Sequence, residues 1–284
     1  MTDLVTIDGL VFDGEGGSNW VYQKLSGWYS SPPMRTDGDP RPNADGTFGS
    51  TRNYRGARAL TFVGSLQADT FAEAETTLWD AFAAIQSDGV PFPLSVTTAN
   101  GTRTCTVSLS GSAEVNEAAD RRTAIVTAQF VADDPVKYGP TRTVTTGLPM
   151  SGGGLEYPLG SPSGALYYGA LGDLGRVVLS NAGTAEVWPS FTVTGELTGG
   201  FFLQCLETGD VLRYERVVPA GTSVSLDART GEVLVDGVSD GSTYLVRDDW
   251  FSVPKGSSRT VQFNAVSGSS GTPQMAATIS DGYW

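Results

Sequence analysis

The residue types that most often do chemistry in proteins are scarce in this chain. It has no histidine among its 284 residues and only two cysteines, Cys105 and Cys205. Histidine is the commonest general base and the commonest metal ligand, so Ser-His-Asp and Cys-His sites are excluded. The two cysteines stand in separate strand-like runs, which excludes a thiolate zinc site. We expect two buried free thiols, with a disulfide between the two halves of the chain as the open alternative.

A metal or phosphate site would have to come from acidic or glycine-rich loops. Residues 37–46 read DGDPRPNADG and resemble a calcium loop, but the ligand spacing does not fit, and Phe48 stands where the closing acidic residue belongs. The glycine runs at 14–17 and 152–154 lack the following helix or the Lys-Ser/Thr pair of a phosphate loop. We therefore predict no catalytic residue, no cofactor-binding residue and no metal ligand.

Two kinds of sugar chemistry remain as alternatives. The 31 acidic residues could supply a carboxylate pair for a glycoside hydrolase, although the adjacent Asp248 and Asp249 would point to opposite faces of a strand. Aromatic side chains that could stack on sugar rings are Tyr167, Tyr168, Trp188, Trp250 and Trp284. Core packing is the competing interpretation for Trp188 and Trp250. We expect the terminal Trp284 to be seated in a neighbouring subunit or frayed.

Acidic residues are spread evenly along the chain. Residues 1–140 carry 10 basic and 17 acidic residues, and residues 141–284 carry 8 and 14, which gives a net charge of −13 overall. Sequence-specific nucleic-acid binding needs a basic face, so this distribution argues against it. No stretch is apolar enough for membrane insertion, and the N-terminus does not look like a signal peptide, so we expect synthesis in the cytoplasm.

The sequence predicts one helix, at 69–88, in a chain whose other elements are predicted to be strands. Thr70 and Glu73 have the spacing of a capping box, and Gly89 followed by Pro91 ends the pattern. Apolar residues recur at steps of three and four, namely Phe71, Ala74, Leu78, Phe82 and Ile85. This stripe predicts a helix packed on a sheet.

The rest of the first part reads as strands around a long loop. Hairpins are predicted at 3–13, with Asp8-Gly9 at the turn, and at 93–109, with Asn100-Gly101 at the turn. Further strands are predicted at 20–29, 57–66 and 121–132. Residues 30–56 are rich in Pro, Gly, Asp and Arg, and loops of that length are usually functional or held by a neighbour.

The second part shows strands and turns only. Gly, Pro and Ser dominate residues 141–164, which we interpret as a linker. Nine short runs follow, at 176–180, 187–195, 201–207, 211–218, 222–228, 232–237, 242–246, 258–265 and 274–280. This rhythm of strands and turns predicts a β-sandwich or jelly-roll-like domain over 165–284. The chain as a whole is predicted to be mainly β, with a β-sandwich-like first domain that carries the helix.

The order of these pieces resembles the distal tail proteins of siphophages, which are long-tailed, non-contractile bacteriophages. In phages of actinobacteria such proteins are often labelled minor tail proteins. The resemblance rests on the opening LVTIDGLVFDG hairpin, the long loop before ALTFVGSL, the helix and RRTAIVTAQFVADDPVKYG. In the second part it rests on SNAGTAEVWPSFTVTGEL, on Leu226-Asp227 with Gly231, and on the Pro254-x-Gly256 segment that leads to Phe263.

The resemblance implies a structural virion protein rather than an enzyme. Members of that family form a ring, usually a homo-hexamer, that joins the tail tube protein to the central tail tip protein and leaves a lumen for DNA. Residues 1–140 would build the ring, and 30–56 would be an arm that reaches a neighbouring subunit. The galectin-like second domain would point outward at the tail tip, or baseplate. The tape measure protein and a host-surface glycan are further expected partners, and a carbohydrate-binding adhesion protein is the first alternative function.

Overall fold

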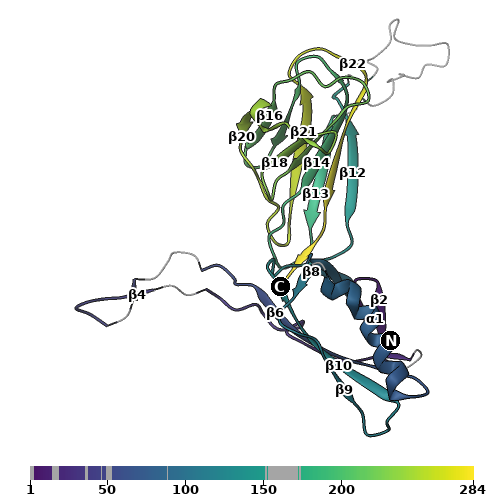
Figure 1. Cartoon of the computed structure of the whole chain (residues 1–284). Helices are drawn as coiled ribbons and strands as arrows, with labels where there is room; N and C mark the ends of the chain where they lie inside the picture. The colour runs from purple at the N-terminus through teal and green to yellow at the C-terminus, as the bar shows by residue number, and fades with distance from the viewer. Residues whose placement is uncertain are drawn as a thin grey trace, which may run out of the picture. The chain divides into compact units, whose positions relative to one another are not determined.

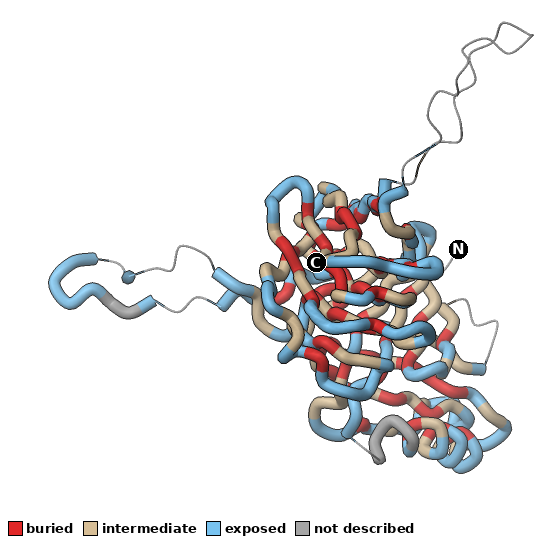
Figure 2. The backbone as a smooth tube through the Cα atoms, turned by 90° about the horizontal axis from the view of Figure 1, so that it is seen from above, coloured by how far each residue is buried: buried red, intermediate tan, exposed pale blue. Residues whose placement is uncertain are grey.

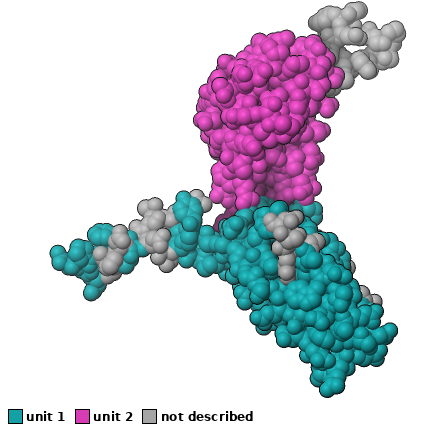
Figure 3. All heavy atoms as spheres, viewed as in Figure 1, with its two compact units in different colours: residues 1–140, 283–284 teal, residues 141–282 magenta. Residues whose placement is uncertain are grey.

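A computed structural model gives the structure of the chain, which divides into two compact units. Unit 1 holds Met1–Pro140 with Tyr283–Trp284, and unit 2 holds Thr141–Gly282 (Figure 3). The structure describes residues 3–14, 19–35, 38–45, 47–48, 53–87, 89–150, 152, 172 and 174–284. No helix in these ranges is long and apolar enough to cross a membrane.

Unit 1 is built on a ten-stranded sheet (Figure 1). Its strands are β1 (Leu4–Ile7), β2 (Leu10–Asp13), β3 (Trp20–Ser26), β6 (Arg58–Gln67), β7 (Phe92–Thr98), β8 (Gly101–Leu109), β9 (Glu114–Glu117), β10 (Thr123–Ala132), β11 (Lys137–Tyr138) and β23 (Gly282–Tyr283). Both predicted hairpins are present, β1–β2 and β7–β8. Asp8 and Gly9 have φ of 46° and 85°, the left-handed pair that a tight two-residue hairpin turn requires.

The sheet of unit 1 closes on itself. Its order is β23-β11-β8-β7-β1-β2-β3-β6-β10-β9, and β10 also pairs with β8 through Phe130↔Leu109 and Val131↔Ser108. The strands from β8 through β1 and β3 to β10 therefore form a closed ring around one core. We expected a sandwich-like domain, and the pairing of β8 with β10 makes the arrangement closer to a barrel. Closure leaves fewer unpaired edges than two stacked sheets would.

Helix α1 (Phe71–Ser87) covers part of this sheet, as the apolar stripe predicted. Thr70 caps it, because its Oγ1 accepts a hydrogen bond from the backbone N–H of Glu73 at 3.3 Å. Ala74, Leu78 and Phe82 are fully buried and belong to the same core cluster as Phe62 and Phe130 of the sheet. The helix therefore packs on β6 and β10, which confirms its expected place.

Unit 2 is a sandwich of two antiparallel sheets. One contains β12 (Arg142–Gly147), β14 (Ser190–Leu197), β17 (Ser223–Asp227), β18 (Glu232–Val235), β19 (Ser239–Asp240) and β22 (Ser269–Ile279). The other contains β13 (Arg176–Asn181), β15 (Phe201–Cys205), β16 (Val211–Tyr214), β20 (Leu245–Asp248) and β21 (Ser257–Ala265). A short 3₁₀ turn, Ser242–Tyr244, precedes β20. The mainly β fold is thus confirmed.

Strand β12 lies in the segment that we expected to be linker. Residues 141–164 were interpreted as a linker, but Arg142–Gly147 pair with β22 along their whole length, from Arg142↔Ile279 to Gly147↔Gln274. The strand reads RTVTTG and has one buried residue, Thr146, so it lacks the alternating apolar pattern that identified the other strands. Of the rest of the expected linker, residues 151 and 153–164 lie outside the described ranges.

Candidate functional site

Residues 30–56 are hereafter called the arm, and the described parts of the arm form two antiparallel segments. Near its start the two segments are joined by the bridge Met34↔Arg55 and by backbone hydrogen bonds from Arg35 N to Tyr54 O and from Gly56 N to Pro33 O, both 2.8 Å. Farther along, β4 (Asp39–Pro40) pairs with β5 (Thr47–Phe48). Residues 38, 41–45, 47–48 and 53–54 of the arm are exposed (Figure 2).

Large apolar side chains on the arm lie open to solvent. The exposed fractions are 48% for Met34, 62% for Phe48 and 58% for Tyr54. The Arg41 guanidinium lies over the Phe48 ring, 5.6 Å from its centroid. An isolated two-stranded ribbon is at best marginally stable in water, and exposed apolar residues gathered on it indicate a contact surface.

Arg58, the first residue of β6, anchors the chain where the arm begins. Its side chain is 1% exposed and donates hydrogen bonds to the carbonyls of Gly27, Ser30 and Pro135 at 2.9, 2.7 and 3.0 Å. Burial lowers the pKa of this guanidinium. Lys137, also buried, donates from Nζ to the Trp28 carbonyl at 2.8 Å. These two cations fix residues 27–30, from which the arm departs.

The C-terminal residues of the chain lie against two arginines of unit 1. The Arg103 guanidinium lies 3.9 Å from the centroid of the Tyr283 ring, and the Arg55 guanidinium lies 4.4 Å from that of Trp284. We expected Trp284 to be seated in another subunit or frayed. The structure instead seats it on its own chain, because a guanidinium at the arm offers it a cation–π partner.

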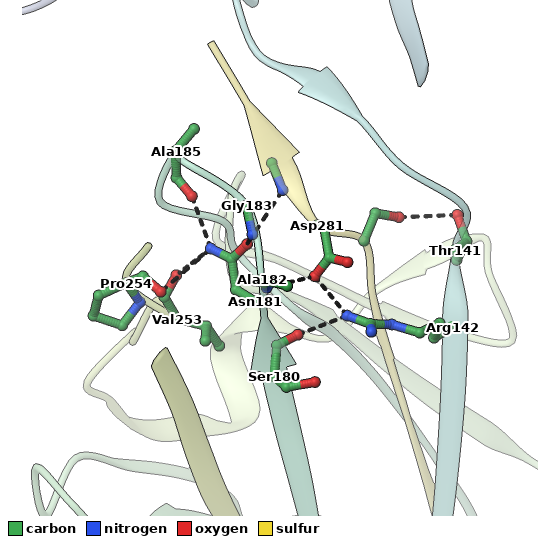
Figure 4. Close-up of polar contacts among 12 residues, drawn as sticks. Thr141, Arg142, Ser180, Asn181, Ala182, Gly183, Ala185, Val253, Pro254 and Asp281 are labelled. Carbon is green, nitrogen blue, oxygen red and sulfur yellow. Dashed lines mark hydrogen bonds and ion pairs between the residues drawn. The ribbon is translucent and has the colours of Figure 1, made fainter. Parts of the chain in front are cut away.

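In unit 2 the side chain of Asn181 satisfies five backbone groups (Figure 4). Its Nδ2 donates to the carbonyls of Ala185, Val253 and Pro254 at 2.7, 3.2 and 3.3 Å. Its Oδ1 accepts from the N–H groups of Gly183 and Gly282 at 3.0 and 3.3 Å. The Asn-x-Gly-Thr sequence that carried part of the resemblance is therefore a structural element of the sandwich.

Asp281 adds a second set of bonds to the same place. Its Oδ1 accepts from Ala182 N at 2.9 Å and from Arg142 Nη2 at 2.7 Å, and Arg142 Nη2 also donates to the Ser180 carbonyl (Figure 4). Thr141 Oγ1 lies 3.0 Å from Ser280 Oγ. The first and last residues of unit 2 are thus tied to each other and to the Asn181 turn.

Of the described aromatic residues that could form a sugar platform, Trp188 alone is exposed. Trp188 is 42% exposed and Trp250 is half-buried. The core position next to them belongs to Phe251, which packs against Phe191 with ring centroids 5.7 Å apart. Tyr167 and Tyr168 lie outside the described residues. Core packing was therefore the wrong interpretation for Trp188, whose indole stays open to solvent.

The remaining candidates for chemistry are engaged in structure or lie partly outside the described ranges. Cys105 and Cys205 are both free and buried, as expected for packed thiols, and burial raises the pKa of Cys105 to about 12. Asp249 Oδ2 accepts from Val211 N at 3.3 Å. In the described ranges no three His, Cys, Asp or Glu side chains gather as a metal site would need. The 37–46 segment is only partly described.

Comparison with known families gives this geometry a context. Residues 182–272 match the model of the siphovirus-type tail component, C-terminal domain. The matched part of the chain is therefore similar to that C-terminal domain. This match confirms the resemblance to siphophage tail proteins that was drawn from the sequence. No curated protein sequence gives a significant match to the chain.

Solved structures extend the likeness to the whole chain. The Dit (gp 19.1) protein of phage SPP1, described as a paradigm of the hub adsorption apparatus in phages that infect Gram-positive bacteria, shares 15% identity and a TM-score of 0.64, with 100% of both chains covered. Chains of the phage p2 baseplate in its activated conformation, with Ca or with Sr, share 11% and 12% identity and TM-scores of 0.53, with 98% of both chains covered. At these identities the likeness establishes a common fold.

Proposed function

We propose that this tail component is a distal tail protein that forms a ring, a homo-hexamer, between the tail tube protein and the central tail tip protein. The observation that carries the proposal is the full-length likeness to the Dit protein of a phage adsorption hub, together with the family match of residues 182–272. In this function the protein is a structural part of the tail tip or baseplate and not an enzyme.

Residues 1–140 build the ring in this proposal, and the arm makes the contact between subunits. The arm exposes Met34, Phe48 and Tyr54, which gain burial when a second copy covers them. Its charge fits a copy of the same chain. Residues 30–56 hold four basic and three acidic residues, whereas the rest of residues 1–140 holds six basic and fourteen acidic ones. A mildly basic arm is therefore attracted to an acidic neighbour.

The lumen of such a ring would let DNA pass. The even acidity of the chain, with a net charge of −13, supports this, because a lumen of the same sign as the phosphate backbone does not retain DNA. The tape measure protein is a further partner that a lumen at this position would accommodate. Unit 2 is then a galectin-like sandwich on the outside of the ring.

The experiment that tests the ring is a native mass measurement over a range of protein concentrations. The proposal expects an assembly of six times the 29.8 kDa mass of one chain. High salt should weaken it, since part of the attraction between arm and neighbour is electrostatic. A stable monomer at high concentration, both alone and mixed with tail tubes, would contradict the proposal.

A second candidate function, carbohydrate binding by unit 2, is favoured by one observation. Trp188 presents a 42% exposed indole on the sandwich, and such a ring can stack on a sugar. A glycan array probed with the full chain and with Trp188→Ala tests it. Binding that the substitution removes would support host-surface adhesion, and the absence of any glycan signal would reject it. The glycoside hydrolase alternative requires turnover of cell-wall polysaccharide that a single acid-to-amide change abolishes.

A further inference from the structure

The last residue of the chain contacts the arm directly. Trp284 belongs to unit 1, and its ring lies 4.4 Å from the guanidinium of Arg55. Tyr283, one residue earlier, lies under the guanidinium of Arg103, 3.9 Å from the ring centroid. Two successive aromatic residues therefore hold the chain end on unit 1 through two separate cation–π contacts.

Arg55 contacts the opposite segment of the arm through both its backbone and its side chain. Its backbone forms the bridge to Met34, and its Nη1 donates to Ser31 Oγ and to the Pro32 carbonyl. Ser31 and Pro32 lie on the outgoing segment, whereas Arg55 lies on the returning one. The same guanidinium that receives the Trp284 ring thus links both segments where the arm leaves the sheet.

The backbone bonds of Arg35 and Gly56 and the β4–β5 pairing join the two segments of the arm to each other rather than to the sheet. Residues 38, 41–45, 47–48 and 53–54 are exposed, so core packing does not restrain these residues within one chain. An arginine side chain without a partner samples many rotamers, and an aromatic ring over its planar head removes much of that freedom. Seating Trp284 on Arg55 therefore favours the rotamer in which Arg55 reaches Ser31 and Pro32.

We propose that Trp284 is a positioning residue for the arm. By holding the Arg55 guanidinium across the two segments, it presets the arm in the direction in which a second copy of the chain can receive it. The first half of the inference concerns one chain alone. The second half, the effect on assembly, rests on the proposed function of the arm as the contact between subunits.

The first measurement needs no assembly. Amide hydrogen exchange is followed by NMR at Arg35 and Gly56, whose N–H groups bond across the two segments, in the full chain and in Trp284→Ala. We expect exchange at both amides to be roughly 2- to 30-fold faster in the variant, which is the range that one cation–π contact produces. Trp284→Phe should lie in between, because a phenyl ring keeps a weaker contact with the cation.

Two control variants separate positioning from general damage. Trp188→Ala removes another exposed tryptophan, from unit 2, and should leave exchange at Arg35 and Gly56 unchanged. Arg103→Ala loosens Tyr283 but leaves Arg55 intact, so it should have a smaller effect than Trp284→Ala. Equal exchange at Arg35 and Gly56 in the full chain and in Trp284→Ala would overturn the inference, as would an absence of protection in the full chain.

The second measurement is the concentration at which rings form, compared between the full chain and Trp284→Ala. A rise in that concentration together with faster exchange supports both halves of the inference. Faster exchange in a chain that never forms a ring supports the positioning role and rejects the proposed function. Rings that form at the same concentration despite faster exchange reject the assembly half alone.

Discussion

Gly183 lies directly against the backbone of Gly282 in unit 2. A Cβ atom at position 183 would come within 2.7 Å of the carbonyl carbon of Gly282 and 2.8 Å of its nitrogen. Both glycine N–H groups bond to the same oxygen, Oδ1 of Asn181. The close approach brings the end of unit 2 onto the turn after β13, and it explains why this position carries a glycine although its φ is not positive.

Replacing Gly183 by alanine should therefore destabilise unit 2. The added methyl group meets backbone rather than a movable side chain, so we expect a loss of about 1–3 kcal/mol in the free energy of unfolding. Gly268→Ala is the matched control, because its Cβ would approach only the Thr198 hydroxyl, at 3.3 Å. Urea denaturation of both variants measures the effect, and equal stabilities would show that the contact with Gly282 yields at little cost.

Removing the Asn181 side chain should cost more than removing an exposed neighbour. Asn181→Ala leaves the carbonyl of Ala185 and the N–H of Gly183 without their partner inside the protein, with an expected loss of about 3 kcal/mol. Ser180→Ala is the control, because Arg142 bonds to the Ser180 main-chain carbonyl, which the change preserves. Thermal unfolding of the three proteins provides the comparison. A melting temperature of Asn181→Ala equal to that of Ser180→Ala would contradict the role of the side chain.

The elements that were predicted correctly from the sequence are those whose conformation is determined by residues close together in the chain. Asp8-Gly9 and Asn100-Gly101 fix their hairpins locally, and Thr70 fixes the start of α1. The family resemblance also led to Asn181 through its Asn-x-Gly-Thr sequence. The partners of Asn181, however, include Val253 and Gly282, which no local pattern could have identified.

Pairings between strands that are distant in the sequence were not predicted, because no local pattern of residues encodes them. The pairing of β8 with β10 closes the sheet of unit 1 through Phe130↔Leu109, yet each strand alone reads as an ordinary half-buried strand. Strand β12 is polar and mostly exposed, so its register on β22 comes from backbone pairing that leaves no apolar alternation to detect. The cation–π contact between Trp284 and Arg55 forms because the fold brings the C-terminal residues back to unit 1.

The buried Lys137 should make the stability of unit 1 depend on pH. Burial, with the guanidiniums of Arg58 and Arg103 nearby, lowers the pKa of Lys137 from 10.5 to about 8. Above pH 8 the folded chain has released this proton while the unfolded chain still holds it, so the free energy of unfolding rises with pH. The contribution between pH 8 and pH 9 is about 1 kcal/mol.

Denaturation of the full chain and of Lys137→Met at pH 8, 8.5 and 9 isolates this contribution. Between pH 8 and pH 9 the free energy of unfolding of the full chain should rise by about 1 kcal/mol more than that of Lys137→Met. Cys105 lowers the free energy of unfolding as the pH rises above 9. Its pKa is raised to about 12 in the folded chain, so the unfolded thiol loses its proton first. Parallel pH profiles of the two proteins would show that Lys137 keeps its ordinary pKa in the folded chain.

Deleting residues 34–52 should abolish ring formation and leave the monomer folded. Residues 34–35, 38, 41–45 and 47–48 of this stretch are exposed, and the sheet strands β3 and β6 lie outside it. Circular dichroism and the melting temperature check the fold, and native mass measurement checks assembly. The control is Val238→Ser, which changes an 85% exposed residue of unit 2. Normal rings from the deletion variant would refute the assignment of the arm to the subunit contact.

The most direct test of the central claim is an electron-microscopy image of the purified protein and of the tail tip that contains it. The account predicts a six-fold ring with an open lumen, the arms of residues 30–56 contacting adjacent subunits, and the sandwich of residues 141–282 on the outside. A tail tip in which this chain is a peripheral monomer, or in which residues 1–140 make no contact with a second copy, would contradict it.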